Sequence, residues 1–216
     1  MGKLWRRLKQ VFCTVAAASS ASSCVTSGGL PARPLTRGET DMAKTIFGND
    51  IDYNKVHIYN GAPEVAGIFR LSETGLAAIT PNGDIYIVDK DAQVSDLSKA
   101  SAAKRRMLIH EMTHVWQHQH GVDVEREAVV LYFKSSFKYN DCYAYNVDGQ
   151  LQFKSMNIEQ QAHMVEDYFA LRETPKGKAP ADRDAKIAQF EAVLRPHLPL
   201  SAGHRDGPPP KPGHPA

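Results

Sequence analysis

The sequence is poor in cysteine, and this limits the sites that it can build. Its three cysteines stand at positions 13, 24 and 142, so Cys142 is the only one outside the N-terminal segment. One thiol cannot form an internal disulfide, and nothing near it supplies the histidine and orienting group that a cysteine nucleophile needs. The chain also lacks a CxxC pair and a glycine-rich phosphate loop, which disfavours structural zinc fingers and nucleotide binding.

A long apolar helix and a dominant charge are absent as well. The most apolar helical stretch of the domain, residues 125–137, is too short to cross a bilayer, so no transmembrane span is expected there. The 26 basic residues nearly balance the 24 acidic ones, and a formal charge of +2 implies no polyanionic partner. Basic residues near the N-terminus have no interleaved aromatic residues, so no nucleic-acid partner is predicted.

The 216 residues suit one domain with an appendage at each end. In segment 1–30, basic residues precede a mild apolar run and small residues that end at Cys24, which resembles a secretory leader with a lipoprotein-type cleavage box. A disordered basic arm is the alternative. A leader would export the domain, residues 35–198, to the periplasm, the cell envelope or the medium. Residues 199–216 are rich in proline and glycine and predict a disordered tail.

The sequence does contain a motif typical of a metal site, His-Glu-Met-Thr-His at residues 110–114. Two histidines four residues apart lie one above the other on a helix, so their rings can share one metal ion. Glu111 can then act as a base on a water molecule that the metal activates. The pattern fixes only three positions and can arise by chance, so the surrounding sequence has to support it.

The residues around the motif favour a helix over residues 98–120. Strong helix formers precede the motif, and Gly121 suits a left-handed cap at the C-terminal end. His118 and His120 fall outside the spacing that a zinc-binding helix uses, so we interpret them as polar surface near the helix end. The two histidines of the motif remain the candidate ligands.

Capping signals predict two further helices. Thr36 and Glu39 form a capping-box pattern for a helix that ends at Gly48, and Asn157 with Gln160 forms another. A last amphipathic helix is predicted over residues 182–195.

A catalytic zinc ion needs a third protein ligand, and the helix that opens at position 157 offers one. Glu159, His163 and Glu166 stand at i, i+4 and i+7, on one face of that helix. Glu159 is the preferred ligand because a carboxylate in the first turn is also favoured by the helix dipole, and His163 is its rival. Glu166 or Asp167 is expected to accept the free N–H of a ligating histidine.

Strands are predicted ahead of the motif. Residues 55–59 alternate as a strand should, residues 67–71 form a second short candidate, and a Pro-Asn-Gly-Asp turn joins residues 77–80 to residues 85–88 as a hairpin. The strand over residues 85–88 is expected to be the edge that holds an extended peptide beside the metal.

A second small hairpin is expected over residues 143–153. Its Tyr143 and Tyr145 are candidates to stabilise the oxyanion that forms when water attacks a peptide carbonyl. Half-buried strand tyrosines are commoner than catalytic ones, so a purely structural role stays open for both.

Four separated segments resemble the Vgr-related zincin-like metallopeptidases. They are residues 35–56, 80–86, 110–117 and 157–168, and they occur in the expected order. That family includes peptidase domains carried by bacterial type VI secretion spike proteins and by free-standing effectors. The resemblance covers residues 35–172 and leaves out both ends of the chain.

The resemblance implies a gluzincin-type site, with Zn²⁺ held by His110, His114 and Glu159 and with Glu111 as the catalytic base. The expected fold is α+β, a small and mainly antiparallel sheet packed on the motif helix and on a second ligand-bearing helix. The expected activity is hydrolysis of a peptide or protein substrate by an effector-like metallopeptidase, with an immunity protein or a secretion spike as candidate partners. Two alternatives stay open: a catalytically silent zincin-fold binding module, and an amidase acting on cell-wall peptides.

Overall fold

The computed structural model of the chain describes residues 32–61, 77–134, 143–145 and 152–201. The predicted leader with its Cys24, the predicted strand at residues 67–71, Cys142 and most of the predicted tail lie outside these residues. At the C-terminal end, Leu200 is buried and the Ser201 N–H donates a hydrogen bond to the Thr45 carbonyl oxygen. The packed part of the chain therefore continues to Leu200.

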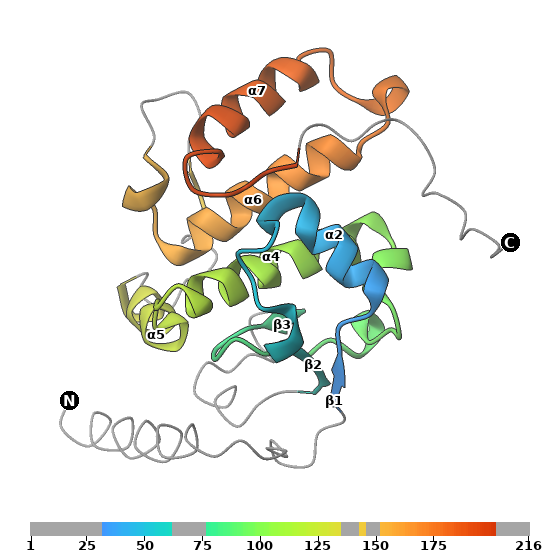
Figure 1. Cartoon of the computed structure of the whole chain (residues 1–216). Coiled ribbons are helices and arrows are strands. Elements are labelled where there is room, and N and C mark those ends of the chain that lie inside the picture. Colours follow the sequence, from blue (N-terminus) through green and yellow to red (C-terminus); the bar gives the residue numbers. More distant parts are fainter. Residues whose placement is uncertain (1–31, 62–76, 135–142, 146–151, 202–216) are drawn as a thin grey trace, which may run out of the picture.

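The described residues form a mixed α and β fold in which helix α4 (Ala102–Gln119) lies at the centre (Figure 1). A small sheet lies on one side of α4, and helices α6 (Ile158–Glu173) and α7 (Arg183–Leu194) lie on the other. The predicted α+β class is confirmed, and the motif of residues 110–114 lies on the helix between the two layers.

The sheet has the strand order β1-β2-β4-β3. Strands β1 and β2 pair antiparallel, β2 and β4 pair parallel, and β4 and β3 pair antiparallel, so the sheet is mainly antiparallel as predicted. The strand bounds are Ala32–Pro34 for β1, His57–Asn60 for β2, Ala78–Ile79 for β3 and Ile85–Ile87 for β4.

The hairpin predicted around the Asn-Gly turn is confirmed, because Ala78 pairs with Ile87 in the β3–β4 register. Gly83 in this turn has φ 88°, and a Cβ atom there would lie 2.6 Å from Cδ2 of His118 on α4. The prediction that the second strand of the hairpin is the edge is wrong. Strand β4 lies between β2 and β3, so β3 ends the sheet among the described residues.

The predicted capping boxes are both present. In α2 (Arg37–Phe47) the Thr36 side chain accepts from the Glu39 N–H while the Glu39 side chain accepts from the Thr36 N–H, and Asn157 and Gln160 do the same for α6. None of the described helices is long and apolar enough to cross a membrane. The remaining helical elements are α5 (Val124–Lys134) and the short 3-10 turns Tyr53–Lys55, Lys90–Ala92, Leu97–Lys99, Phe153–Ser155 and Lys176–Lys178.

Two predicted elements differ from the structure. The motif helix begins at Ala102 and not at residue 98, because the Asp96 side chain caps a separate 3-10 turn over Leu97–Lys99 and Ala100 is extended. The second hairpin is not seen in the described part of its range, since residues 143–145 form no strand and Phe153 begins a 3-10 turn. Phe153 is buried in the core, so its tertiary packing and not the strand pattern decides its conformation.

Helix α4 is buried on all sides over its middle turns. Every residue from Leu108 to Val115 is buried, and so is Gln117. Such a helix belongs to the interior, with apolar neighbours from the sheet on one side and from α6 on the other. The polar groups of the motif are therefore withdrawn from bulk water, and each needs a partner within the protein.

A buried carboxylate joins the N-terminal strand to the turn that precedes α4. Glu39 is 0% exposed and accepts two hydrogen bonds from the Arg33 guanidinium, at 2.8 and 2.7 Å. It also accepts from the backbone N–H groups of Thr36 and Leu97, each at 2.8 Å. One side chain thereby fixes β1, α2 and the start of the segment that leads into the motif helix.

Candidate metal centre

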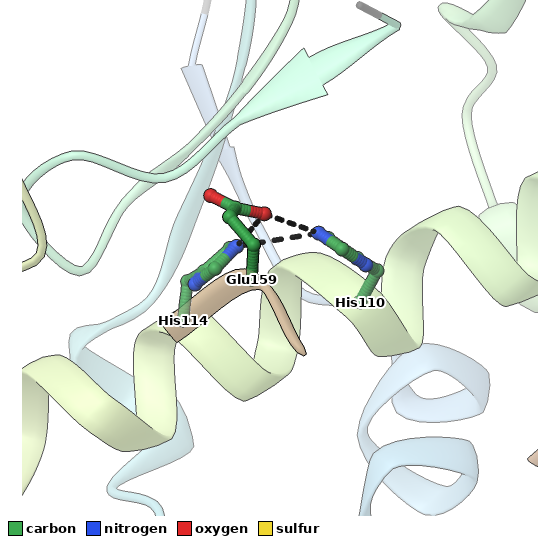
Figure 2. Close-up of side chains that lie close together, drawn as sticks. All are labelled: His110, His114 and Glu159. Atoms are coloured by element: carbon green, nitrogen blue, oxygen red, sulfur yellow. Dashed lines mark hydrogen bonds and ion pairs between the residues drawn. The ribbon is translucent and has the colours of Figure 1, made fainter. Parts of the chain in front are cut away.

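Three side chains from two helices converge between the layers. His110 and His114 lie one turn apart on α4, and Glu159 reaches them from the first turn of α6 (Figure 2). Their exposed fractions are 8%, 4% and 4%. Glu159 Oε2 lies 3.3 Å from His110 Nε2 and 3.4 Å from His114 Nε2, and the two Nε2 atoms are 3.3 Å apart.

This triangle has the dimensions of a metal site. A tetrahedral ion with bonds of about 2.0–2.1 Å to nitrogen and oxygen separates its ligand atoms by about 3.3–3.4 Å. The three ligand atoms stand at that separation with no rearrangement of the side chains. Together the three residues can hold a metal ion and leave a fourth coordination position open.

The pKa values of the three groups describe how they share charge without a cation. Burial alone would lower the pKa of His110, but hydrogen bonds to Glu159 and Glu166 outweigh it and raise the value to about 10. The pKa of His114 is also raised, because the charge of Glu159 outweighs the effect of burial. Burial would raise the pKa of Glu159, yet the two imidazoles hold it well below its usual range. The site therefore concentrates negative charge that protons or a metal ion must balance.

His110 is oriented by charged neighbours. Its Nδ1 lies 3.2 Å from Glu166 Oε2, and the Arg106 guanidinium binds the other oxygen of Glu166 at 3.1 Å. Burial would raise the pKa of Glu166, but the hydrogen bond and charge of His110 lower it, so the carboxylate is ionised and accepts the ring N–H. Glu166 thus has the position expected of it from the sequence. Asp167 instead accepts hydrogen bonds from Arg106 and Tyr145.

His114 is oriented by an amide. Its Nδ1 lies 2.8 Å from Gln117 Oε1, and Gln117 is fully buried. We did not expect this partner from the sequence, where Gln117 was one of several polar residues near the end of the helix. Its i, i+3 spacing from His114 is the signal that could have revealed it.

Glu111 lies on the sheet side of α4. Its Oε2 accepts a hydrogen bond of 2.7 Å from the Thr80 hydroxyl, which directly follows strand β3. Burial raises the pKa of Glu111, although the neighbouring imidazoles and Thr80 oppose the shift. A carboxylate of raised pKa that is held in a fixed position is suited to accept a proton near neutral pH. The sequence alone did not indicate that Thr80 would contact Glu111.

The other candidate residues lie beside the triangle. His163 places Nε2 3.8 Å from Asp167 Oδ2 and Nδ1 3.3 Å from the Tyr143 carbonyl oxygen, outside the three-ligand group. The Tyr143 ring lies 5.9 Å from the His110 ring, between centroids. Tyr145 donates its hydroxyl to Asp167 at 2.6 Å, and burial and this carboxylate raise its pKa. Of the two tyrosines, Tyr143 is the one whose ring neighbours His110, a candidate ligand.

A hollow of about 630 Å³ opens next to these residues, between α6 and α7. Its lining comprises Arg106, Tyr143, Ala144, Tyr145, His163, Asp167, Ala170, Leu171, Thr174, Lys186, Gln189 and Phe190. Tyr143 thus borders both the His110 ring and this hollow.

Comparison with known proteins identifies a similar sequence and a similar solved structure. The chain matches no protein-family profile, but it is 37% identical over 163 residues to the type VI secretion system spike protein VgrG2b of Pseudomonas aeruginosa. The solved effector domain of VgrG2b aligns with a TM-score of 0.60 at 29% identity, over 85% of this chain and 93% of that domain. The chain is therefore similar in both sequence and fold to the VgrG2b effector domain.

The similarity is confined to that part of the spike protein. The alignment covers 76% of this chain but spans only 15% of the length of VgrG2b. The Vgr-related resemblance found in the sequence is confirmed at this level, as similarity to an effector domain.

Proposed function

We propose that the chain is a zinc-dependent, zincin-like peptidase of the gluzincin type. The observation that carries this proposal is the triangle of His110, His114 and Glu159, whose ligand atoms lie 3.3 to 3.4 Å apart around one point. Two imidazoles and one carboxylate with a fourth position open form a ligand set typical of catalytic zinc. When bound, zinc supplies the Lewis acidity that polarises a peptide carbonyl and makes water easier to deprotonate.

Different residues of the chain then have different roles in hydrolysis. Glu111, held by Thr80, takes a proton from the attacking water and later gives it to the leaving amine. Glu166 accepts the Nδ1–H of His110 and keeps Nε2 free to act as a ligand. Tyr143 stays our candidate to stabilise the developing oxyanion, because its ring lies next to the ring of His110.

The sheet offers a place for an extended peptide. Strand β3 ends the sheet among the described residues, and Thr80 at its end contacts Glu111. A substrate that adds to β3 by main-chain hydrogen bonds lies beside the catalytic base. The hollow that Tyr143 borders, next to the His110 ring, offers room for side chains of the substrate.

The biological setting that we propose follows from the relative. VgrG2b is a type VI secretion spike protein, and the similar region is its effector domain. We therefore propose that this chain is an exported effector that travels with a secretion spike. We also propose an immunity protein, in the cell that makes the effector, as a second partner.

The deciding experiment compares the wild-type protein with Glu111→Gln on peptide and peptidoglycan-fragment libraries, read by mass spectrometry with and without a chelator. We expect chelator-sensitive cleavage by the wild type and a loss of about 10²-fold or more in the variant, which keeps its volume and its zinc. Cleavage of proteins or of cell-wall peptides distinguishes a proteinase from an amidase. No cleavage by zinc-loaded wild-type protein would favour a silent binding module and refute the proposal.

A further inference from the structure

We infer that Gln117 and Gln161 form a chain of amide hydrogen bonds that sets the proton position of His114 and joins it to the helix that carries Glu159. The inference rests on the proposed metal centre and concerns how two of its ligands, from different helices, are held relative to each other. Its basis is the direction in which each hydrogen bond must run.

The direction is fixed at the far end of the chain. Gln161 Nε2 donates to the carbonyl oxygens of Phe153 and Met156, at 3.0 and 3.3 Å. A backbone carbonyl can only accept, so the amide nitrogen of Gln161 must face these two oxygens and its Oε1 must face Gln117. Gln117 Nε2 donates to that Oε1 at 2.9 Å and also to the Ile158 carbonyl oxygen at 3.1 Å.

The orientation of Gln117 then determines the state of His114. With its nitrogen committed to two acceptors, Gln117 presents Oε1 to His114 Nδ1 at 2.8 Å. An amide oxygen cannot donate, so Nδ1 must carry the proton. In the neutral ring, the lone pair is therefore on Nε2, the atom that points toward Glu159 and His110. A flip of either amide would place two acceptors or two donors face to face.

The same chain sets the position of the second helix. All three backbone acceptors belong to residues 153–158, the segment that leads directly into Glu159. Gln117 is fully buried, so water cannot readily replace these bonds. One amide thus contacts a ligand ring on α4 and the peptide next to the ligand carboxylate on α6.

The two histidines are consequently held by different chemistry. His110 depends on the ionised pair Glu166 and Arg106, whereas His114 depends on neutral amides that run to backbone carbonyls. A substitution of Gln117 should therefore weaken the site through His114 and leave the contacts of His110 in place.

The test uses methionine, which is close to glutamine in size but cannot form the amide bonds. We would measure zinc affinity by competition with a chromophoric chelator for Gln117→Met, Gln161→Met, the double variant and the control Gln119→Met. Gln119 is on the same helix and makes two bonds to the Asp52 backbone, but none to a ligand. Circular dichroism of the metal-free proteins checks that each variant is folded.

We expect the zinc dissociation constant of Gln117→Met to rise about 10- to 100-fold, as for other partners of metal-ligating histidines. Gln161→Met should show a smaller rise, and the double variant should match Gln117→Met because Gln161 acts through Gln117. In the zinc-loaded wild type, NMR should detect a slowly exchanging Nδ1 proton on His114 that is lost in Gln117→Met.

Three results would overturn the inference. Equal zinc affinity in Gln117→Met and wild type would show that the amide chain does not position the ligand, while the proposed function would stand. Fully additive losses in the double variant would show two independent packing effects. If neither the wild type nor Gln119→Met binds zinc, the proposed metal centre itself fails and the inference with it.

Discussion

Removal of the Glu159 carboxylate should remove most of the stabilisation of the protein by zinc. A ligand at 100 times its dissociation constant raises the free energy of unfolding by about 2.7 kcal/mol. For a chain of this size each kcal/mol shifts the melting temperature by about 2–4 °C, so zinc should raise the melting temperature of the wild type by about 5–11 °C. Glu159→Ala deletes one of the three ligand atoms that lie 3.3 to 3.4 Å apart.

A 100-fold or greater loss of affinity would leave about 0.4 kcal/mol of stabilisation at the same zinc concentration, or about 1–2 °C. The assay is thermal unfolding of metal-free protein titrated with zinc, together with metal content by mass spectrometry. The comparison uses the zinc-induced shift and not the absolute melting temperature, because the variant also removes the partner that holds the pKa of His110 and His114 high.

The matched variant is His163→Ala, since His163 lies on the same helix face but outside the ligand triangle. It should keep the full zinc-induced shift. Loss of the shift in His163→Ala with retention in Glu159→Ala would refute the assignment of the third ligand, because the triangle would then not be the binding site.

Two further predictions follow from the groups around the site. Thr80→Val removes the hydroxyl that donates to Glu111 and helps to lower its pKa. Turnover should therefore fall about 10-fold, and the acidic limb of the pH–rate profile should move to higher pH. The control Thr113→Val should change neither, because among the described residues the Thr113 hydroxyl bonds only the Ile109 carbonyl oxygen in its own helix. The pKa of His110 is raised from 6.5 to about 10, so its contribution to the stability of the metal-free protein is complete below pH 6.5 and is lost as the pH rises toward 10. Urea denaturation in the presence of a chelator should therefore show a falling free energy of unfolding over this range, and excess zinc should remove the fall; a flat curve without zinc would contradict the assigned pKa.

The features that the sequence predicted well are those whose signal is local. Each capping box lies within four consecutive residues. The Asn-Gly turn is likewise a short-range signal for the hairpin that it joins. His110 and His114 lie one helical turn apart, so their proximity required only that the helix form. Glu159 lies 45 residues beyond His114, and its choice over His163 needed helix-face spacing and the family resemblance.

The features that were missed depend on contacts between distant segments. The parallel pairing of β2 with β4 makes β3 the end strand, and no pattern within either strand specifies that neighbour. Thr80 meets Glu111 only because the hairpin packs against α4. The role of Gln117 depends on Gln161 and on the carbonyl groups of Phe153, Met156 and Ile158, at and just before the start of α6. The sequence pattern of a single helix does not predict these contacts.

The Arg33–Glu39 pair limits how far the protein can be shortened from its N-terminal side. Removal of residues before position 32 would leave the pair intact. A truncation past Arg33 would leave the fully buried Glu39 carboxylate without its cation, which would lower the free energy of unfolding by about 3–5 kcal/mol. The same carboxylate anchors the Leu97 N–H, so the damage would reach the segment that delivers the motif helix. Any minimal version intended for metal-binding or activity work should therefore retain the first strand.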